Sequence, residues 1–435
     1  MPRRAHPLGR WTLVALVVAN MIGAGVFTTS GFAIGDLGTP TLVLTAWLIG
    51  GGIAICGALS YGALARLIPA SGGEYLYLSR AVHPLVGFLA GWVSLLAGFT
   101  GAIAYSAITF IAYALPSLAG SAAGALAASG VVVIAAMLHG IALRPGATAQ
   151  NVAVAVKLIA IAGFCGYALI ASDVGNWPGL QAAAIESTAF PLGTFALTLM
   201  WISFSYSGYN AAVYLAGEVP EGATRVPPAL VIGTAVTMLA YLALNAIFVL
   251  APERADIAFQ QDVAAIAART VGGPGLETAV RGLIALALLT SVSAMIMAGP
   301  RVYAKMADDE LLPRALRFEG RIPSASIWMQ AALAIIVVWI AELRQLLSYL
   351  GFTLGLSTAA TIACLFVLVR RRGAGARDLP GYPWAPALYI VCTLVFAALG
   401  ATQSPIEMGA AIATIASGAL LYLGISRSRS QRRPA

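Results

Sequence analysis

Two short stretches of this sequence place helix-weakening residues inside long apolar segments. The first, Asn20 to Phe27, puts Gly23 and Gly25 in the middle of the first apolar segment. Glycine in a helix interior costs about 1 kcal/mol relative to alanine, and backbone that leaves a helix within a bilayer exposes polar groups. The two glycines therefore indicate either a face for close helix packing or a break whose main chain binds a ligand.

The second stretch, Trp201 to Asn210, crowds serines, Gly208 and Asn210 into another apolar segment. Serine and asparagine side chains compete with the backbone for hydrogen bonds and weaken a helix locally. Broken helices at corresponding positions of two halves are typical of inverted-repeat transporters, whose site lies near the bilayer midplane. The two stretches together are more informative than either one alone.

Two such breaks can bind a zwitterion with main-chain groups alone. Free N–H groups at the start of the outer half-helix suit a carboxylate, and free carbonyls at the ends of half-helices suit an ammonium group. No charged side chain lies in either stretch. The predicted substrate-binding residues are Met21, Ile22, Gly23, Ala24, Gly25, Val26, Phe204, Ser205, Tyr206 and Gly208.

Lys157 is the only ionisable side chain well inside an apolar segment, about eight residues from the start of the segment at 149–171. Such a lysine is either a snorkelling side chain near the membrane surface or, by default for an intramembrane charge, a functional group. The three histidines are scattered and the four cysteines lie in apolar segments. The sequence therefore predicts no metal site, no cofactor and no catalytic cluster.

Composition determines the class of protein. Sixty per cent of the 435 residues are apolar and 10% are charged, too few charges for a soluble surface. Long apolar runs recur along the chain, which predicts an all-α polytopic membrane protein. The first apolar segment lacks a small-residue cleavage site and is interpreted as a retained span. The net charge of +8 comes from arginines between spans, so we expect no nucleic-acid partner.

Twelve transmembrane helices are predicted in one transporter domain, 1–435. Twenty of the 25 Lys and Arg residues fall on one side of these spans, which predicts that both termini are cytoplasmic. The long outer loop 251–279 has an alanine-rich pattern that suggests a short helix, either a lid or a surface linker. The predicted spans are 11–34, 41–68, 84–114, 122–143, 149–171, 190–216, 227–251, 280–306, 324–341, 343–371, 383–401 and 405–425.

At these residues the chain resembles the amino acid–polyamine–organocation (APC) superfamily of permeases. The resemblance implies a LeuT-type 5+5 inverted repeat with helices 1 and 6 broken. The first repeat would be 11–171, the second 190–371, and two accessory helices would occupy 383–425. The stretches that carry the resemblance are Ile22 to Phe27, Ser60 to Leu64 with Ile68 to Tyr75, Phe204 to Asn210 with Glu218, and Arg301 to Pro313.

The resemblance also implies roles for side chains. Phe204 matches the aromatic gate of the family, although packing is the commoner role of such a residue. Lys157 matches a lysine that replaces sodium in sodium-independent members. Ser291, Ser293 and Tyr241 would lie near it, although serines often simply pack between helices. The residues expected near the cytoplasmic mouth, as inner-gate ion pairs or merely solvated charges, are Glu74, Glu218 and Arg301.

These observations predict a sodium-independent secondary transporter of neutral L-amino acids, an antiporter or a proton symporter, in the cytoplasmic (inner) membrane. Its partners would be the amino acid substrate and the lipid bilayer. The loop 115–122 has no cysteine, and light-chain members of the family use a cysteine there, so no disulfide-linked subunit is expected. The alternatives are a polyamine, agmatine or cationic amino acid antiporter and, outside this class, a membrane nutrient receptor. An enzyme is not expected, because it would need clustered acid, base or metal groups.

Overall fold

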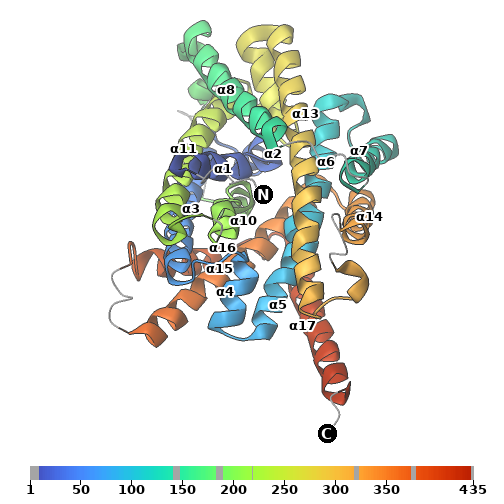
Figure 1. The fold of residues 1–435 in the computed structure, drawn as a ribbon. Coiled ribbons are helices and arrows are strands. Elements are labelled where there is room, and N and C mark those ends of the chain that lie inside the picture. Colours follow the sequence, from blue (N-terminus) through green and yellow to red (C-terminus); the bar gives the residue numbers. More distant parts are fainter. Residues whose placement is uncertain are drawn as a thin grey trace.

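The structure is a computed structural model that describes residues 9–140, 147–182, 190–217, 219–317, 323–373 and 379–432. All regular elements of these residues are helical. Figure 1 shows α13 running along the length of the bundle and α17 extending past it toward the C-terminus. The α-helices are α1 (Arg10–Met21), α2 (Ala24–Leu37), α3 (Pro40–Leu67), α4 (Gly73–Ala81), α5 (Pro84–Val93), α6 (Ala102–Ala114), α7 (Ala122–Gly140), α8 (Ala147–Ala171), α9 (Pro178–Ala182), α10 (Leu192–Ser205), α11 (Gly222–Leu250), α12 (Arg254–Ile257), α13 (Val263–Asp308), α14 (Ser324–Ile340), α15 (Leu343–Arg372), α16 (Trp384–Gly400) and α17 (Pro405–Arg432).

In the described residues, seven helices are long and apolar enough to cross a membrane, or up to eight when the bent pair α1–α2 counts as one span. Four shorter apolar helices accompany them, namely Ala155–Ala171, Leu192–Ser205, Ser324–Ile340 and Trp384–Gly400. The prediction of an all-helical polytopic membrane protein is confirmed. The number of twelve spans and the inverted repeat stay predictions.

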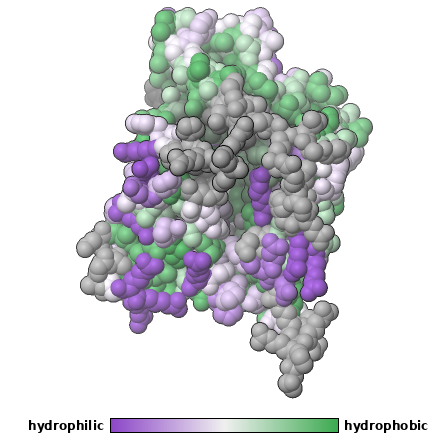
Figure 2. All heavy atoms as spheres, viewed as in Figure 1, coloured by the Kyte–Doolittle hydropathy of each residue, from purple (hydrophilic) through white to green (hydrophobic). Residues whose placement is uncertain are grey.

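The surface has the pattern expected of a membrane protein. Large apolar side chains stand exposed on the outside of the bundle, such as Ile159, Ile170 and Ile406, of which 72%, 88% and 81% is accessible. Figure 2 shows hydrophilic residues gathered toward the lower end of the molecule, where Figure 1 places α4 and α5. Exposed isoleucine in a soluble protein would face water, whereas here it can face lipid.

The first apolar segment is broken where the glycines predicted it. Helix α1 ends at Met21 and α2 begins at Ala24, and the two are bent by 43°. Between them, Ile22 (φ −74°, ψ 86°) and Gly23 (φ −118°, ψ −163°) are not helical. The break lies at residues 22–23, so that Gly25 belongs to the first turn of α2.

The second interruption follows α10. This helix ends at Ser205, and a turn over 206–210 leads into a short 3₁₀ helix, Ala211–Leu215. Gly208 within the turn has a positive φ of 104°, a conformation that residues with a side chain rarely adopt. The crowding of serine, glycine and asparagine thus marks the true end of a helix.

Candidate functional site

The two interruptions lie directly against each other. A Cβ atom at Gly208 would stand 2.8 Å from the carbonyl oxygen of Asn20, and one at Gly25 would stand 2.4 Å from Ser205 Oγ. Real Cβ atoms do not approach other atoms so closely. The glycines are therefore required because two main chains cross here. The two interpretations of these glycines, close helix packing and a helix break, both apply.

The start of α2 offers main-chain donors inside the protein. The first N–H groups of a helix, here those of Ala24, Gly25 and Val26, have no partner within the helix. The N-cap residue Gly23 supplies no side-chain hydrogen bond, and Ala24 and Val26 are buried, with 4% and 0% of their surface exposed. A buried helix N-terminus without a capping side chain suits a bound anionic group such as a carboxylate.

The carbonyl groups at the breaks accept hydrogen bonds from two other helices. The hydroxyl group of Tyr241, on α11, donates to the oxygens of Met21 and Ser205 at 2.5 and 3.1 Å. Tyr241 therefore bridges both breaks. The predicted ammonium-binding carbonyl oxygens are thus partly engaged, although each keeps a second lone pair for a ligand.

Lys157 reaches the first break from α8. Its Nζ atom donates to the carbonyl oxygen of Ile22 at 2.6 Å, and only 6% of the residue is exposed. The side chain also lines an apolar hollow of about 360 Å³, mouth included, together with Phe27, Phe248 and Ile284. The ammonium group is buried and bonded to the end of α1, which favours a functional role over snorkelling.

Phe204 lies at the end of α10, half-buried, with its ring edge-to-face on Tyr105 at 5.4 Å. Tyr105, on α6, was missed by the sequence reasoning. Its hydroxyl group shares a 2.5 Å hydrogen bond with Thr28 of α2, and the next residue, Thr29, contacts Ser205 Oγ at 3.0 Å. Nothing in the apolar sequence around Tyr105 distinguishes it from a packing residue, because its partners are distant in the sequence.

Ser291 and Ser293 make their hydrogen bonds to groups other than Lys157. Ser291 Oγ donates to the carbonyl oxygen of Ala287 in its own helix at 2.9 Å, and Ser293 Oγ lies 2.8 Å from His139 Nε2. The contact of Ser293 fits the alternative in which serines pack between neighbouring helices. His139 was expected only at a loop or helix end, and it lies in the last turn of α7.

The two predicted inner-gate residues that the structure describes, Glu74 and Arg301, do not form an ion pair with each other. Glu74 accepts hydrogen bonds from Tyr61 and Asn210, whereas Arg301 donates to the carbonyl oxygen of Met297 at 3.1 Å. Glu218 lies outside the described residues. Among the residues that can be described, the expected pairing of Glu74 with a basic side chain is absent, and neutral donors replace it.

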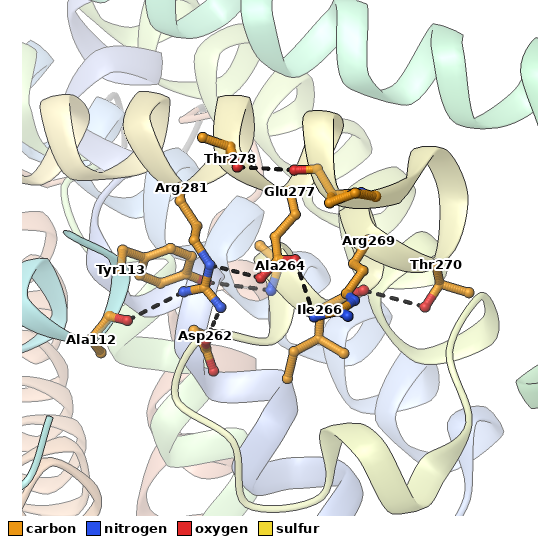
Figure 3. A network of polar contacts seen from close by, with 11 residues as sticks. Ala112, Tyr113, Asp262, Ala264, Ile266, Arg269, Thr270, Glu277, Thr278 and Arg281 are labelled. Atoms are coloured by element: carbon orange, nitrogen blue, oxygen red, sulfur yellow. Dashed lines mark hydrogen bonds and ion pairs between the residues drawn. The ribbon is translucent and has the colours of Figure 1, made fainter. Parts of the chain in front are cut away.

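A polar network joins the beginning of α13 to the end of α6 (Figure 3). The beginning of α13, before the non-helical Gly272 and Gly273, is the short helix expected in the outer loop. Its Ala264 N–H donates to Tyr113 Oη at 3.3 Å, and the Tyr113 hydroxyl group donates to the carbonyl oxygen of Phe27 at 2.7 Å. The beginning of α13, the end of α6 and α2 are thereby joined.

Arg281 is the centre of this network. It contacts Asp262 at 2.6 Å and Glu277 at 2.9 Å, and it donates to the carbonyl oxygen of Ala112 at 3.4 Å. Figure 3 shows its guanidinium group between these partners, while Arg269 approaches Glu277 from the side. Only 19% of the Arg281 side chain is exposed, against 70% for Arg269.

Replacing Arg281 with glutamine is therefore expected to lower stability by about 2 kcal/mol, because it leaves a half-buried carboxylate without its charged donor. The matched change Arg269→Gln removes an exposed pair at 3.6 Å, and such pairs contribute about 0–1 kcal/mol. Thermal unfolding of the two purified variants in detergent measures the difference. Equal unfolding temperatures would mean that the contacts of Arg281 do not stabilise the beginning of α13.

The sequence is similar to known transport proteins along almost its whole length. Residues 8–421 match the amino acid permease family. The human Asc-type amino acid transporter 1 is 24% identical, over 96% of this chain and 82% of that protein. The serine/threonine exchanger SteT of Bacillus subtilis is 25% identical, over 97% of each chain. The human large neutral amino acids transporter small subunit 2 is 24% identical, over 96% of this chain and 80% of its own.

Proposed function

The chain belongs to the amino acid permease family, and from this premise we propose that it is a sodium-independent secondary transporter of neutral L-amino acids. The observation that carries the proposal is the contact between the two helix breaks, where the buried start of α2 faces inward without a capping side chain. Relatives named for serine/threonine exchange and for large neutral amino acids support the same substrate class.

The charge at the breaks favours a neutral substrate. Met21, Ile22, Phe204 and Ser205 supply apolar surface and main-chain oxygens, and no carboxylate lies in either break. A polyamine or a second cationic group on the substrate would need such a carboxylate. An agmatine or cationic amino acid antiporter therefore remains the second choice.

The rest of the proposal concerns the membrane and the mode of transport. The distribution of Lys and Arg supports a multi-pass protein of the cytoplasmic membrane with both termini inside, built as one domain with two inverted repeats and two accessory helices. Substrate would pass by alternating access, in exchange or with a proton. We expect neither an enzymatic activity nor a disulfide-linked subunit.

Reconstitution into liposomes tests the substrate class. Vesicles loaded with an unlabelled neutral amino acid should accumulate the labelled one by counterflow, whereas vesicles loaded with agmatine or arginine should not. Binding that raises the unfolding temperature without any counterflow would instead favour the receptor. Counterflow with agmatine alone would establish the second choice.

Sodium should not stimulate this transport. Lys157 already places a cation at the carbonyl oxygen of Ile22, where a bound sodium ion would otherwise stabilise the end of α1. We expect equal rates of uptake in sodium chloride and in choline chloride of the same concentration. A several-fold increase with sodium would contradict the role given to Lys157 while leaving amino acid transport itself intact.

A further inference from the structure

Glu74 is a buried carboxyl group for which the described residues provide no cationic partner. It lies in the first turn of α4, outside the spans, with 9% of its surface exposed. Within the described part of the chain it forms no ion pair. Its hydrogen-bond donors are the hydroxyl group of Tyr61 and the side-chain amide of Asn210, whose Nδ2 atom lies 3.3 Å from Glu74 Oε1. Burying a carboxylate without a counter-charge is costly.

The two donors converge on one oxygen atom of Glu74. Both Tyr61 Oη and Asn210 Nδ2 contact Oε1. The other carboxyl oxygen accepts no hydrogen bond from the described residues, so it is free to carry a proton while both existing contacts persist. The geometry thus accommodates the neutral acid without rearrangement.

Among the described residues, the titratable groups that interact with Glu74 are tyrosines. The titratable side chains that face it are Tyr61 from α3, Tyr209 and Tyr214 from the segment after α10, and Tyr389 from α16. Burial raises the pKa of Glu74 above its ordinary value, and the hydrogen bonds from Tyr61 and Asn210 oppose this shift without cancelling it. The position of Glu74 in the first turn of α4 also favours the anion.

Glu74 joins the inner loop to the second helix break. Asn210 ends the turn that follows α10, and Tyr61 packs edge-to-face on Tyr209 of the same turn at 5.7 Å. A few residues later, Gly217 N–H donates to Ser71 Oγ at 3.2 Å. Any change at the Glu74 carboxyl group therefore acts directly on the inner end of the broken helix.

We propose that Glu74 is a proton-binding site of the inner gate: the neutral acid stays buried between α3, α4 and the turn after α10, and proton loss to the cytoplasm leaves a buried charge whose hydration separates these elements. The proposal rests on the transport function proposed above and adds its coupling to pH. A carboxyl group whose pKa is raised in the closed state stabilises that state at low pH, and this stabilisation is lost as pH rises through the raised pKa. Exchange should therefore be slow at pH values below the raised pKa and several-fold faster above it.

The test combines exchange with an infrared titration of the purified protein. Counterflow is measured with the same pH on both sides of the membrane, from mildly acidic to mildly alkaline. Glu74→Gln, which keeps the acceptor oxygen of the neutral acid, should show slow exchange at every pH and should lose the carbonyl band of a protonated carboxyl group. The matched control Glu253→Gln changes an exposed carboxyl group before α12 and should keep both the pH profile and the band.

A second variant keeps the proposal open to refutation if Glu74→Gln does not fold. Tyr61→Phe removes a donor that stabilises the anion, so the pH profile and the band should move to higher pH. A band and a pH profile in Glu74→Gln that equal those of the parent protein would overturn the proposal. Absence of counterflow for every amino acid would instead refute the proposed function, since the infrared titration reports on Glu74 without any substrate.

Discussion

Replacing Lys157 with alanine is expected to reduce amino acid counterflow by about tenfold to a hundredfold. The Nζ atom donates a charged hydrogen bond of 2.6 Å to the carbonyl oxygen of Ile22, where α1 ends. Hydrogen bonds to charged groups contribute about 1.5–3 kcal/mol, and each 1.4 kcal/mol changes a population about tenfold. The variant loses the cation that holds the half-helix end in position for the cycle.

A substitution on the same helix separates this effect from general damage to α8. Ile159 lies two residues away, and 72% of its surface is exposed, so Ile159→Ala should keep counterflow near that of the parent protein. Both variants are compared at equal amounts of reconstituted protein. If Lys157→Ala transports as fast as the parent protein, the ammonium group is not needed for transport, and the snorkelling interpretation would be the correct one.

Gly208→Ala should abolish measurable transport. Gly208 has a φ of 104°, a strain of about 1–3 kcal/mol for a residue with a side chain. Its new methyl group would also stand 2.8 Å from the carbonyl oxygen and 2.9 Å from the carbonyl carbon of Asn20. Because these are backbone atoms of α1, relief requires the two breaks to separate, and the site between them would lose its geometry.

Gly163→Ala is the matched control, since no atom lies within 4 Å of a Cβ at that position of α8. Alanine is favoured over glycine in a helix by about 1 kcal/mol, so this variant should be as stable as the parent protein or more stable. For both variants, transport is measured by counterflow, and substrate binding is measured by the rise of the unfolding temperature when substrate is added. Normal substrate binding by Gly208→Ala would show that the crossing of the breaks is not needed for the site.

The positions of the helix breaks could be predicted because the signal is local. Glycine, serine and asparagine weaken a helix wherever they occur, and an apolar segment that contains them in its middle is conspicuous. The observed break lies slightly before the centre of the predicted one: the non-helical residues are Ile22 and Gly23, whereas Gly25 is helical. Gly25 is instead required by its contact with Ser205, which only the packing of α2 on α10 shows.

The partners of the side chains at the site could not be predicted in the same way. Tyr105 reaches Thr28 across 77 residues of sequence, and Tyr241 reaches Met21 across 220. Ser291 and Ser293, assigned by resemblance to the neighbourhood of Lys157, contact Ala287 and His139. Membership of a family transfers a fold more securely than it transfers the orientation of a hydroxyl group.

The sequence by itself determined that this chain consists of apolar helices with two weak points and one lysine well inside an apolar segment, since helix strength and hydropathy depend on residue type and short-range order. Only the tertiary structure decided what the weak points touch, which carbonyl oxygen Lys157 binds, and that Glu74 has neutral partners. The physical reason is that a hydrogen bond requires its two groups to lie within about 3 Å. Such proximity between distant segments arises from packing of the whole bundle.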